Sequence, residues 1–200
     1  MKLPFFQLDV SACSGCKTCV TACLDGRGDT TDRPRRRVME CVGGGWRKRP
    51  DGTWEQNVAA YYLSLSCGHC QDPPCLKACP QGALSRDDRG LTALTGECVG
   101  CRACLAACPY GAPVFDRQSG RLDKCDLCFD RWTAGLAPLC VEACPMGALA
   151  LGGPELTEGL GPQPQPLPDW RTTKPRLAAN RPPKLSRQVQ NFKTVNPEEL

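Results

Sequence analysis

The sequence of 200 residues predicts an α+β fold made of two small modules that are organised around cysteine side chains. Three observations predict this. Sixteen of the 17 cysteines fall into four groups of four. Three of these groups are followed by the same Pro-x-Gly-Ala pattern, which marks an internal repeat. Aromatic residues make up only 6% of the chain, while Gly, Pro and Cys are abundant, so little apolar surface is available to form a core.

Each group of cysteines has the spacing of an iron–sulfur cluster site. The groups are Cys13, Cys16, Cys19 and Cys23 (group one); Cys67, Cys70, Cys75 and Cys79 (group two); Cys98, Cys101, Cys104 and Cys108 (group three); and Cys125, Cys128, Cys140 and Cys144 (group four). Groups one and three follow C-x2-C-x2-C-x3-C, the run of bacterial ferredoxins. Four thiolates for each cubane predict four [4Fe-4S] clusters, which suits a chain that carries electrons. Because metal binding then supplies folding free energy, we expect the apo-protein to be largely unfolded.

Two other uses of cysteine compete with this interpretation. Four-cysteine zinc sites also contain C-x2-C pairs, but their pairs are usually separated, which fits a C-x2-C-x2-C triplet poorly. Group four, with C-x2-C-x11-C-x3-C spacing, is ambiguous when taken alone. A disulfide framework is disfavoured by the odd number of cysteines and by their dense spacing. The iron–sulfur interpretation is therefore favoured.

The cysteine groups are expected to pair in space, because the fourth cysteine of each ferredoxin run ligates the neighbouring cluster. Groups two and three are joined by the short segment 80–97, which suits a single module. Groups one and four would then form a second module, with the first inserted between its halves. Sequential pairing, of one with two and three with four, remains open on spacing alone.

The predicted organisation follows the chain in four parts. Residues 1–57 form the first half of an outer ferredoxin-like module plus an insertion, 58–112 an inner ferredoxin-like module, 113–151 the second half of the outer module, and 152–200 an extended, Pro-rich, partner-binding tail. Within the insertion, the stretches 43–46 and 50–54 are typical of turns. The segment 58–66 is typical of a strand that leads into group two. The tail has no core of its own and is expected to lie along a partner or to stay disordered.

The formal net charge of +4 treats the cysteines as neutral. A bound oxidised cubane with four thiolates carries a net charge of 2−, so four clusters bring the total near 4 − 8 = −4, and many arginines would compensate that charge locally. The basic runs at Arg33, 35–37 and 47–49 could alternatively bind nucleic acid. No recognition motif accompanies them, so a solvated or subunit-facing surface is favoured.

Other residues complete the expectations for the site. Cys41 lies outside every group and is predicted to be a small buried thiol. The single histidine, His69, is predicted to be a neighbour of a cluster that hydrogen-bonds locally rather than a ligand. There is no catalytic constellation, phosphate loop or dinucleotide motif, so no catalytic residue is assigned and the chain alone is not expected to be an enzyme. Neither a signal peptide nor an apolar run of about 18 residues is visible, so another subunit would have to hold the chain at a membrane.

The chain resembles the iron–sulfur (B) subunits of the dimethyl sulfoxide reductase family of molybdopterin oxidoreductases. The cysteine motifs alone specify a wider superfamily that includes subunits of nitrate reductase, formate dehydrogenase and polysulfide reductase, and matches between the motifs narrow it. The segments that carry the resemblance are 13–19, 56–67, 108–113, 124–126, 173–175 and 196–197.

This resemblance implies an electron-transfer subunit of a complex of three subunits. Electrons would pass through four [4Fe-4S] clusters from a quinol-oxidising integral membrane anchor subunit to a molybdopterin-containing catalytic subunit that reduces dimethyl sulfoxide or related S- and N-oxides. The chain would be associated with the membrane through its partners, and exported folded with the catalytic subunit unless the complex faces the cytoplasm. Alternatives are the equivalent subunit of another molybdo- or tungsto-enzyme, acting on polysulfide, another oxyanion or formate, and a free soluble polyferredoxin.

The resemblance also implies the nested pairing and one ligand set for each cluster. The sets are Cys13, Cys16, Cys19 and Cys144 (cluster 1); Cys23, Cys125, Cys128 and Cys140 (cluster 2); Cys67, Cys70, Cys75 and Cys108 (cluster 3); and Cys79, Cys98, Cys101 and Cys104 (cluster 4). Nitrate reductase relatives carry tryptophan at the position of Cys101 and hold a three-iron cluster there. Because a cysteine stands at this position, we expect four four-iron clusters.

Overall fold

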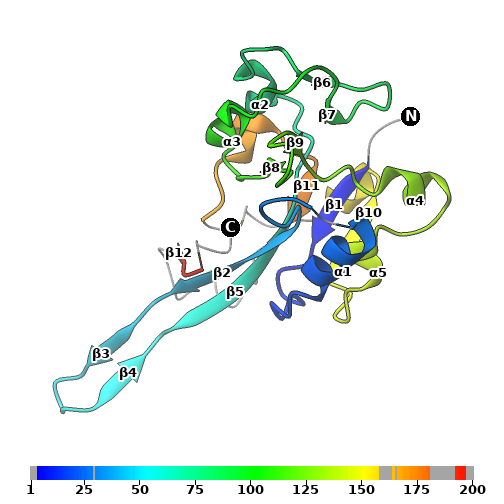
Figure 1. Cartoon of the computed structure of the whole chain (residues 1–200). Helices are drawn as coiled ribbons and strands as arrows, with labels where there is room; N and C mark the ends of the chain where they lie inside the picture. Colours follow the sequence, from blue (N-terminus) through cyan, green and yellow to red (C-terminus); the bar gives the residue numbers. More distant parts are fainter. Residues whose placement is uncertain (1–3, 29, 158–163, 165, 181–191, 197–200) are drawn as a thin grey trace.

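Short strands and helices of one or two turns dominate the computed structural model, in keeping with the many glycines and prolines that interrupt regular structure. It describes residues 4–28, 30–157, 164, 166–180 and 192–196 (Figure 1). In chain order the elements are β1 (Phe5–Leu8), α1 (Thr18–Arg27), β2 (Arg37–Gly43), β3 (Trp46–Lys48), β4 (Trp54–Gln56), β5 (Ala59–Leu65), α2 (Pro74–Lys77), β6 (Leu84–Arg86), β7 (Thr92–Leu94), α3 (Ala103–Ala107), β8 (Val114–Phe115), β9 (Leu122–Asp123), α4 (Phe129–Thr133), α5 (Leu139–Glu142), β10 (Leu149–Gly152), the 3-10 helix η1 (Pro154–Thr157), α6 (Trp170–Thr173), β11 (Leu177–Ala179) and β12 (Lys193–Thr194).

The first and fourth cysteine groups lie together because strands at opposite ends of the chain pair. Strand β1 precedes group one and runs antiparallel to β10, which follows group four, with Phe6 opposite Leu151. On its other edge β1 runs parallel to β11, so the sheet order is β10-β1-β11. Helix α1 packs against α5, where Gly26 leaves room for the side chain of Leu139. We call this part, with groups one and four, the outer module.

The second and third cysteine groups lie at the other end of the body, with α2, α3 and the small β6-β7 and β8-β9 hairpins (Figure 1). Their apolar core is small and consists of Leu84, Cys104, Phe115 and Leu122. We call this part the inner module. Its strands are only two or three residues long, so its backbone ladders supply few hydrogen bonds.

The insertion is a long hairpin that projects from the body as an arm (Figure 1). Strand β5 lies within the predicted strand 58–66 and pairs antiparallel with β2 over seven residue pairs. The predicted turn at 50–54 is confirmed and joins β3 to β4. The prediction of a turn at 43–46 is wrong: Gly44, at φ +85°, interrupts the strand between β2 and β3 without reversing the chain. A side chain there would stand 2.3 Å from the Asn57 carbonyl, which explains the glycine.

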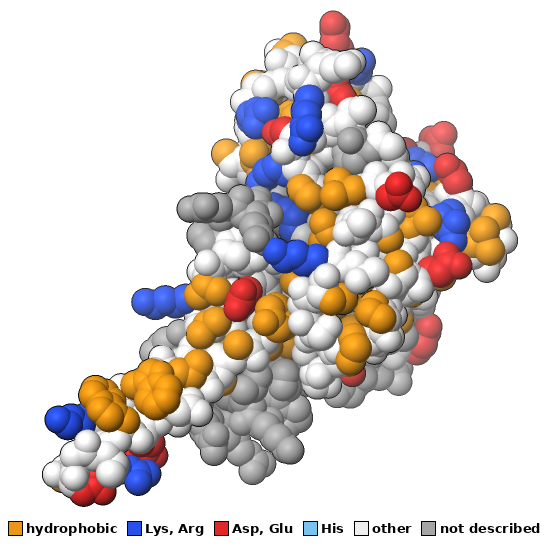
Figure 2. Space-filling model, turned by 60° about the horizontal axis from the view of Figure 1, so that its bottom comes forward, with side chains coloured by type: hydrophobic (Ala, Val, Ile, Leu, Met, Phe, Trp, Pro, Cys, Tyr) orange, Lys and Arg blue, Asp and Glu red, His pale blue; other side chains and the backbone are white. Residues whose placement is uncertain are grey.

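The main apolar core lies between the outer module and the base of the arm. Leu8 of β1, Val38 of β2 and Leu63 of β5 are buried in it, together with Tyr61. Hydrophobic side chains also gather at the far end of the arm (Figure 2), where Trp46 is 66% exposed.

The described part of the tail packs on this same chain. Strand β11 extends the outer sheet, and β12 pairs antiparallel with β2. The ring of Phe192 meets Tyr61 edge to face at 4.7 Å, and the Asn196 side chain donates to the Val38 carbonyl and accepts from the Glu40 N–H. Residues 158–163, 165, 181–191 and 197–200 of the predicted tail lie outside the described residues. Partner binding by the tail stays a prediction.

The basic run at 35–37 corrects one expectation. A solvated or subunit-facing surface is the wrong interpretation for Arg36 and Arg37, which are only 2% and 4% exposed. Arg36 lies just before β2 and hydrogen-bonds Ser64 and Ser66, whereas Arg37, the first residue of β2, hydrogen-bonds the carbonyl of Tyr110. Among the helices described, none has the length and apolar character needed to cross a membrane.

Candidate metal centres

Four of the cavities in the body are each lined by four cysteines, and we number these sites 1 to 4. They are lined by Cys13, Cys16, Cys19 and Cys144 (site 1); Cys23, Cys125, Cys128 and Cys140 (site 2); Cys67, Cys70, Cys75 and Cys108 (site 3); and Cys79, Cys98, Cys101 and Cys104 (site 4). These are the same four sets that the resemblance implies as ligand sets, and each combines three cysteines of one group with the last cysteine of another. That each set binds a cluster stays a prediction.

The four cysteines of each site line one shared cavity. Within the described residues, no three His, Cys, Asp or Glu side chains converge as ligands of one metal ion. A zinc ion needs its sulfurs about 2.3 Å from one point, whereas a cubane spreads its irons toward separate corners. The thiols therefore surround a space, which fits a cluster better than a single ion.

The same backbone feature shapes all four cysteine loops. The residue just before the second cysteine is left-handed in every loop, and these residues are Gly15, His69, Gly100 and Leu127. Their φ angles are +72°, +41°, +69° and +62°. This conformation turns the chain sharply, so that the first two thiols of each loop face the same cavity. It costs about 1–3 kcal/mol in a residue that is not glycine, and tertiary packing has to offset that cost at His69 and Leu127, which are both buried.

The last cysteine of three groups is followed by a second turn. The Pro-x-Gly-Ala pattern places Gly82, Gly111 and Gly147 at φ between +58° and +60°. The N–H of each glycine bonds to the carbonyl of the preceding cysteine, at 3.0 to 3.2 Å. This turn aims the next N–H at sulfur: Ala112 donates to Cys108 Sγ at 3.4 Å and Ala148 to Cys144 Sγ at 3.3 Å. Such N–H donors stabilise thiolates that hold a cluster.

Group one lacks this proline, and the structure gives the consequence. Cys23 lies within α1, which continues for four more residues to Arg27. The Arg27 guanidinium then pairs with Asp126, beside Cys125 in the site 2 loop. The missing proline therefore lets one helix connect sites 1 and 2.

Burial keeps several thiols protonated as long as no metal holds them. Burial raises the pKa of Cys125 to about 12, against the opposing effect of Arg36, and raises the pKa of Cys23, Cys70 and Cys75 to about 11. Cluster assembly would therefore release protons, because the ligands are thiolates. The exposed Cys16 differs: its pKa is lowered, chiefly by hydrogen bonding to the Thr18 side chain.

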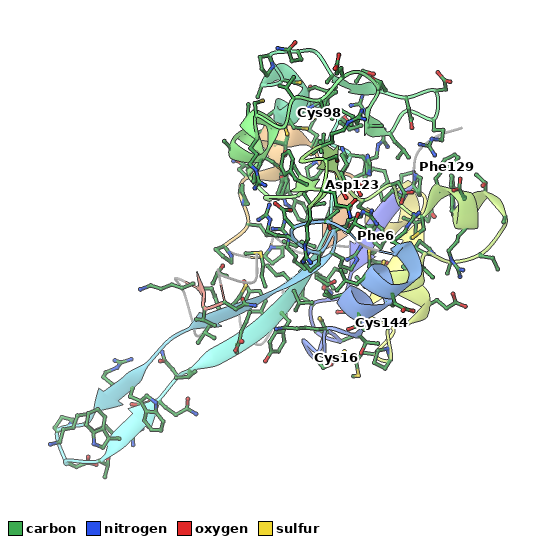
Figure 3. The ribbon with its side chains drawn as sticks, in the orientation of Figure 1. Phe6, Cys16, Cys98, Asp123, Phe129 and Cys144 are labelled. Carbon is green, nitrogen blue, oxygen red and sulfur yellow. The ribbon has the colours of Figure 1, made fainter. Side chains whose placement is uncertain are left out.

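The four sites form a row. Figure 3 shows Cys16 and Cys144 of site 1 at one end, Cys98 of site 4 at the other, and Phe6 and Asp123 between them. Leu84 and Leu122 each line both site 3 and site 4. Sites 2 and 3 meet at neighbouring residues, Cys125 and Lys124. Between sites 1 and 2 lies a hydrogen bond from Arg36 of site 2 to Ser64 of site 1, so the order is 1-2-3-4.

Exposure distinguishes the ends of this row from its middle. Of the 17 cysteines only Cys16 and Cys101 are exposed, and they belong to sites 1 and 4. Every cysteine of sites 2 and 3 is buried or half-buried. The row is thus closest to solvent at its two ends.

The predictions of a buried thiol at Cys41 and of a local hydrogen bond at His69 are confirmed, and the prediction that His69 neighbours a cluster without binding it stays a prediction. Cys41 is fully buried in β2 and lines none of the four cavities. His69 is 1% exposed, and its Nδ1 accepts a hydrogen bond from the Thr92 N–H at 3.2 Å. Sequence reasoning missed the individual roles of Arg36 and Ser64, because nothing in an arginine-rich run or a strand indicates which members face a site. The alternation of side chains along a strand next to group two is the signal that could have found them.

Comparison with known proteins supports this interpretation. Residues 58–153 match the model of a 4Fe-4S dicluster domain. The B subunit of anaerobic dimethyl sulfoxide reductase from Haemophilus influenzae is 43% identical over 98% of this chain and 98% of its own length. The subunit of the same name from Escherichia coli is 46% identical over 86% of this chain and 85% of its own. The iron-sulfur subunit of the nitrate-inducible formate dehydrogenase of Escherichia coli is 38% identical over 72% of this chain and 52% of its own. The protein therefore belongs to the family of iron–sulfur subunits that includes the B subunit of anaerobic dimethyl sulfoxide reductase.

Proposed function

We propose that this chain is the electron-transfer subunit of a molybdenum-dependent reductase. It relays electrons through four [4Fe-4S] clusters between a quinol-oxidising membrane anchor subunit and a molybdopterin-containing catalytic subunit that reduces dimethyl sulfoxide or related S- and N-oxides. The observation that carries the proposal is the row of four cavities, each lined by four cysteines and exposed only at its ends. A relay needs such a row of sites.

A bound [4Fe-4S] cluster supplies a centre that takes up and releases one electron. The residues of this chain would bind the clusters, shield them from water and fix their positions. Sixteen thiolates hold the four sites, and backbone N–H groups such as those of Leu127 and Gly100 point at sulfur from 3.4 Å. The side chains of Leu84 and Leu122 keep water from the space between sites 3 and 4. Cys16 and Cys101 bring the end sites to the surface, where partner subunits would exchange electrons.

The identity of the partners rests on the relatives. Coverage of both full lengths favours the dimethyl sulfoxide reductase relatives over the formate dehydrogenase relative, of which only 52% is matched. We also propose, from the family resemblance alone, that the chain is held at the membrane by its partners and is exported folded with the catalytic subunit. The alternative is a free soluble polyferredoxin, for which the same row of sites would serve.

Anaerobic purification of the tagged chain from its native membranes tests the proposal. We expect a large partner that contains molybdenum and a small hydrophobic subunit to copurify. Metal and sulfide analysis should give about four iron and four sulfide for each of the four sites. Recovery of the chain alone, brown and free of molybdenum, would favour the polyferredoxin, and a colourless chain that contains zinc would contradict both.

A further inference from the structure

The outer module contains a buried cation that has no carboxylate partner. Arg36 is 2% exposed, and no carboxylate forms an ion pair with it among the described residues. Its Nη1 donates to the Ser64 carbonyl at 3.2 Å and to Ser64 Oγ at 3.1 Å, and its Nη2 donates to Ser66 Oγ at 3.0 Å. The guanidinium also hydrogen-bonds the side chain of Cys140 in site 2. An uncompensated charge at this depth would be very costly, so a negative partner is required.

The negative partners available to Arg36 are thiolates of two different sites. It lines site 2 and interacts electrostatically with Cys140, Cys125 and Cys23 of that site. It also interacts with Cys19 of site 1. The guanidinium therefore lies between the two sites of the outer module, with its other face 4.4 Å from the centre of the Phe6 ring.

Ser64 extends the contact to site 1. Its hydroxyl oxygen accepts from Arg36 at 3.1 Å and stands 3.3 Å from Cys19 Sγ. Because the oxygen accepts from the guanidinium, its own proton is free to point at the sulfur. The result is a chain of two hydrogen bonds, from the guanidinium to the hydroxyl and from the hydroxyl to the thiolate of Cys19. A bonded cation polarises the hydroxyl and strengthens the second hydrogen bond.

The neighbouring arginine provides a natural comparison. Arg37, the first residue of β2, is also buried, but its Nη2 donates to the carbonyl of Tyr110 at 2.9 Å. The site thiol that it interacts with is Cys108, which belongs to site 3. Two successive arginines thus interact with thiols of different modules.

We propose that Arg36 is a positioning residue shared by sites 1 and 2, whose single charge sets the reduction potentials of both outer clusters. The inference rests on the proposed cluster sites. A positive charge stabilises the reduced cluster, which carries one more negative charge, and therefore raises the potential. In a dry interior that effect is not screened by salt. The inner clusters, which Arg36 does not contact, should not respond.

Redox titration followed by electron paramagnetic resonance, on the complete holo-complex, tests this. Arg36→Gln should make reduction of two of the four clusters at least tenfold less favourable, which is about 59 mV for a one-electron couple. Arg36→Lys keeps the charge and should restore most of the potential. Ser64→Ala should lower only the potential of site 1, and by less. Arg37→Gln is the matched control: it should change the potential of site 3 and leave the outer pair unchanged.

The outcomes separate this inference from the proposed function. Fewer than four clusters in the parent protein would contradict the proposed function itself. Four clusters whose potentials do not change in Arg36→Gln, or all change equally, would overturn the role of Arg36. If Arg36→Gln does not retain iron, Ser64→Ala and Arg37→Gln decide the matter, because a shift confined to site 1 in the former is required.

Discussion

The outer and inner modules hold the same cysteine loops in different surroundings. The outer module has a three-stranded sheet, a core that reaches the base of the arm, and the buried Arg36 between its sites. The inner module has short hairpins, a core of four buried residues, and two leucines between its sites. The cysteine loop therefore has the same backbone conformation in both modules. The surrounding structure decides how much of each module stays folded without metal and how charge is distributed around each site.

Removal of iron should have the largest effect and should affect the modules unequally. We expect the apo-protein to be largely unfolded, because cluster ligation supplies folding free energy that the small apolar core does not. The inner module should lose all protection from hydrogen exchange. Residual protection should be confined to β2 and β5, which form the longest ladder, and to the part of the outer module that shares their apolar core.

Anaerobic chelation followed by circular dichroism and hydrogen exchange measures this. Cysteine alkylation after chelation is a suitable check that all ligand thiols have become accessible. A cooperative thermal transition with native-like circular dichroism in the apo-protein would refute the expectation. Equal protection in both modules would show that their different cores do not matter.

Substitution of the exposed ligands compares the two ends of the row. Cys16 and Cys101 are equivalent, since each stands between a left-handed glycine and a left-handed basic residue, Lys17 or Arg102. Cys16→Ser and Cys101→Ser should each cost about one iron per chain and give a three-iron signal from one site. The other three sites should remain intact, because the exposed corner can be lost without disturbing buried ligands.

Iron analysis and electron paramagnetic resonance of anaerobic samples measure both variants. The parent protein should show four-iron signals only, and a strong three-iron signal in it would contradict the assignment of Cys101. If Cys101→Ser loses the whole inner module while Cys16→Ser loses one iron, the smaller inner core is the cause. That result would sharpen the difference between the modules.

The sequence predicted the repeated parts of this molecule well and its particular contacts poorly. Ligand spacing is local, so the loops and the glycine turns after Cys79, Cys108 and Cys144 follow from the residues themselves. The long strand β5 was also predictable, from its tyrosines and leucines. The spacing alone left two pairings of the groups open, because the choice depends on β1 meeting β10 across the length of the chain, and only the family resemblance implied the nested pairing. In the same way, the burial of Arg36 depends on strand β5, which contributes Ser64 and brings it beside a site formed elsewhere.

The one cysteine outside the sites gives the smallest expected effect and completes the comparison between ligand and non-ligand thiols. Cys41→Ala should leave the iron content and all four potentials unchanged, since Cys41 lines no site. At neutral pH the lost packing should cost about 1 kcal/mol. Burial, with a smaller contribution from Glu40, raises the pKa of Cys41 from 9.0 to about 12.

The raised pKa of Cys41 determines how its contribution to stability changes at alkaline pH. Above pH 9 the thiol of the unfolded chain ionises while the folded one stays neutral, so the contribution of Cys41 to stability is full below pH 9 and is lost toward pH 12. The thermal midpoint of the parent should therefore fall toward that of Cys41→Ala as the pH rises through this window. Ligand thiols held by iron do not titrate in this pH window. A decrease in the difference between the two thermal midpoints can therefore be assigned to Cys41. A constant gap between parent and variant, or loss of iron from the variant, would show that Cys41 is exposed or bound to a cluster.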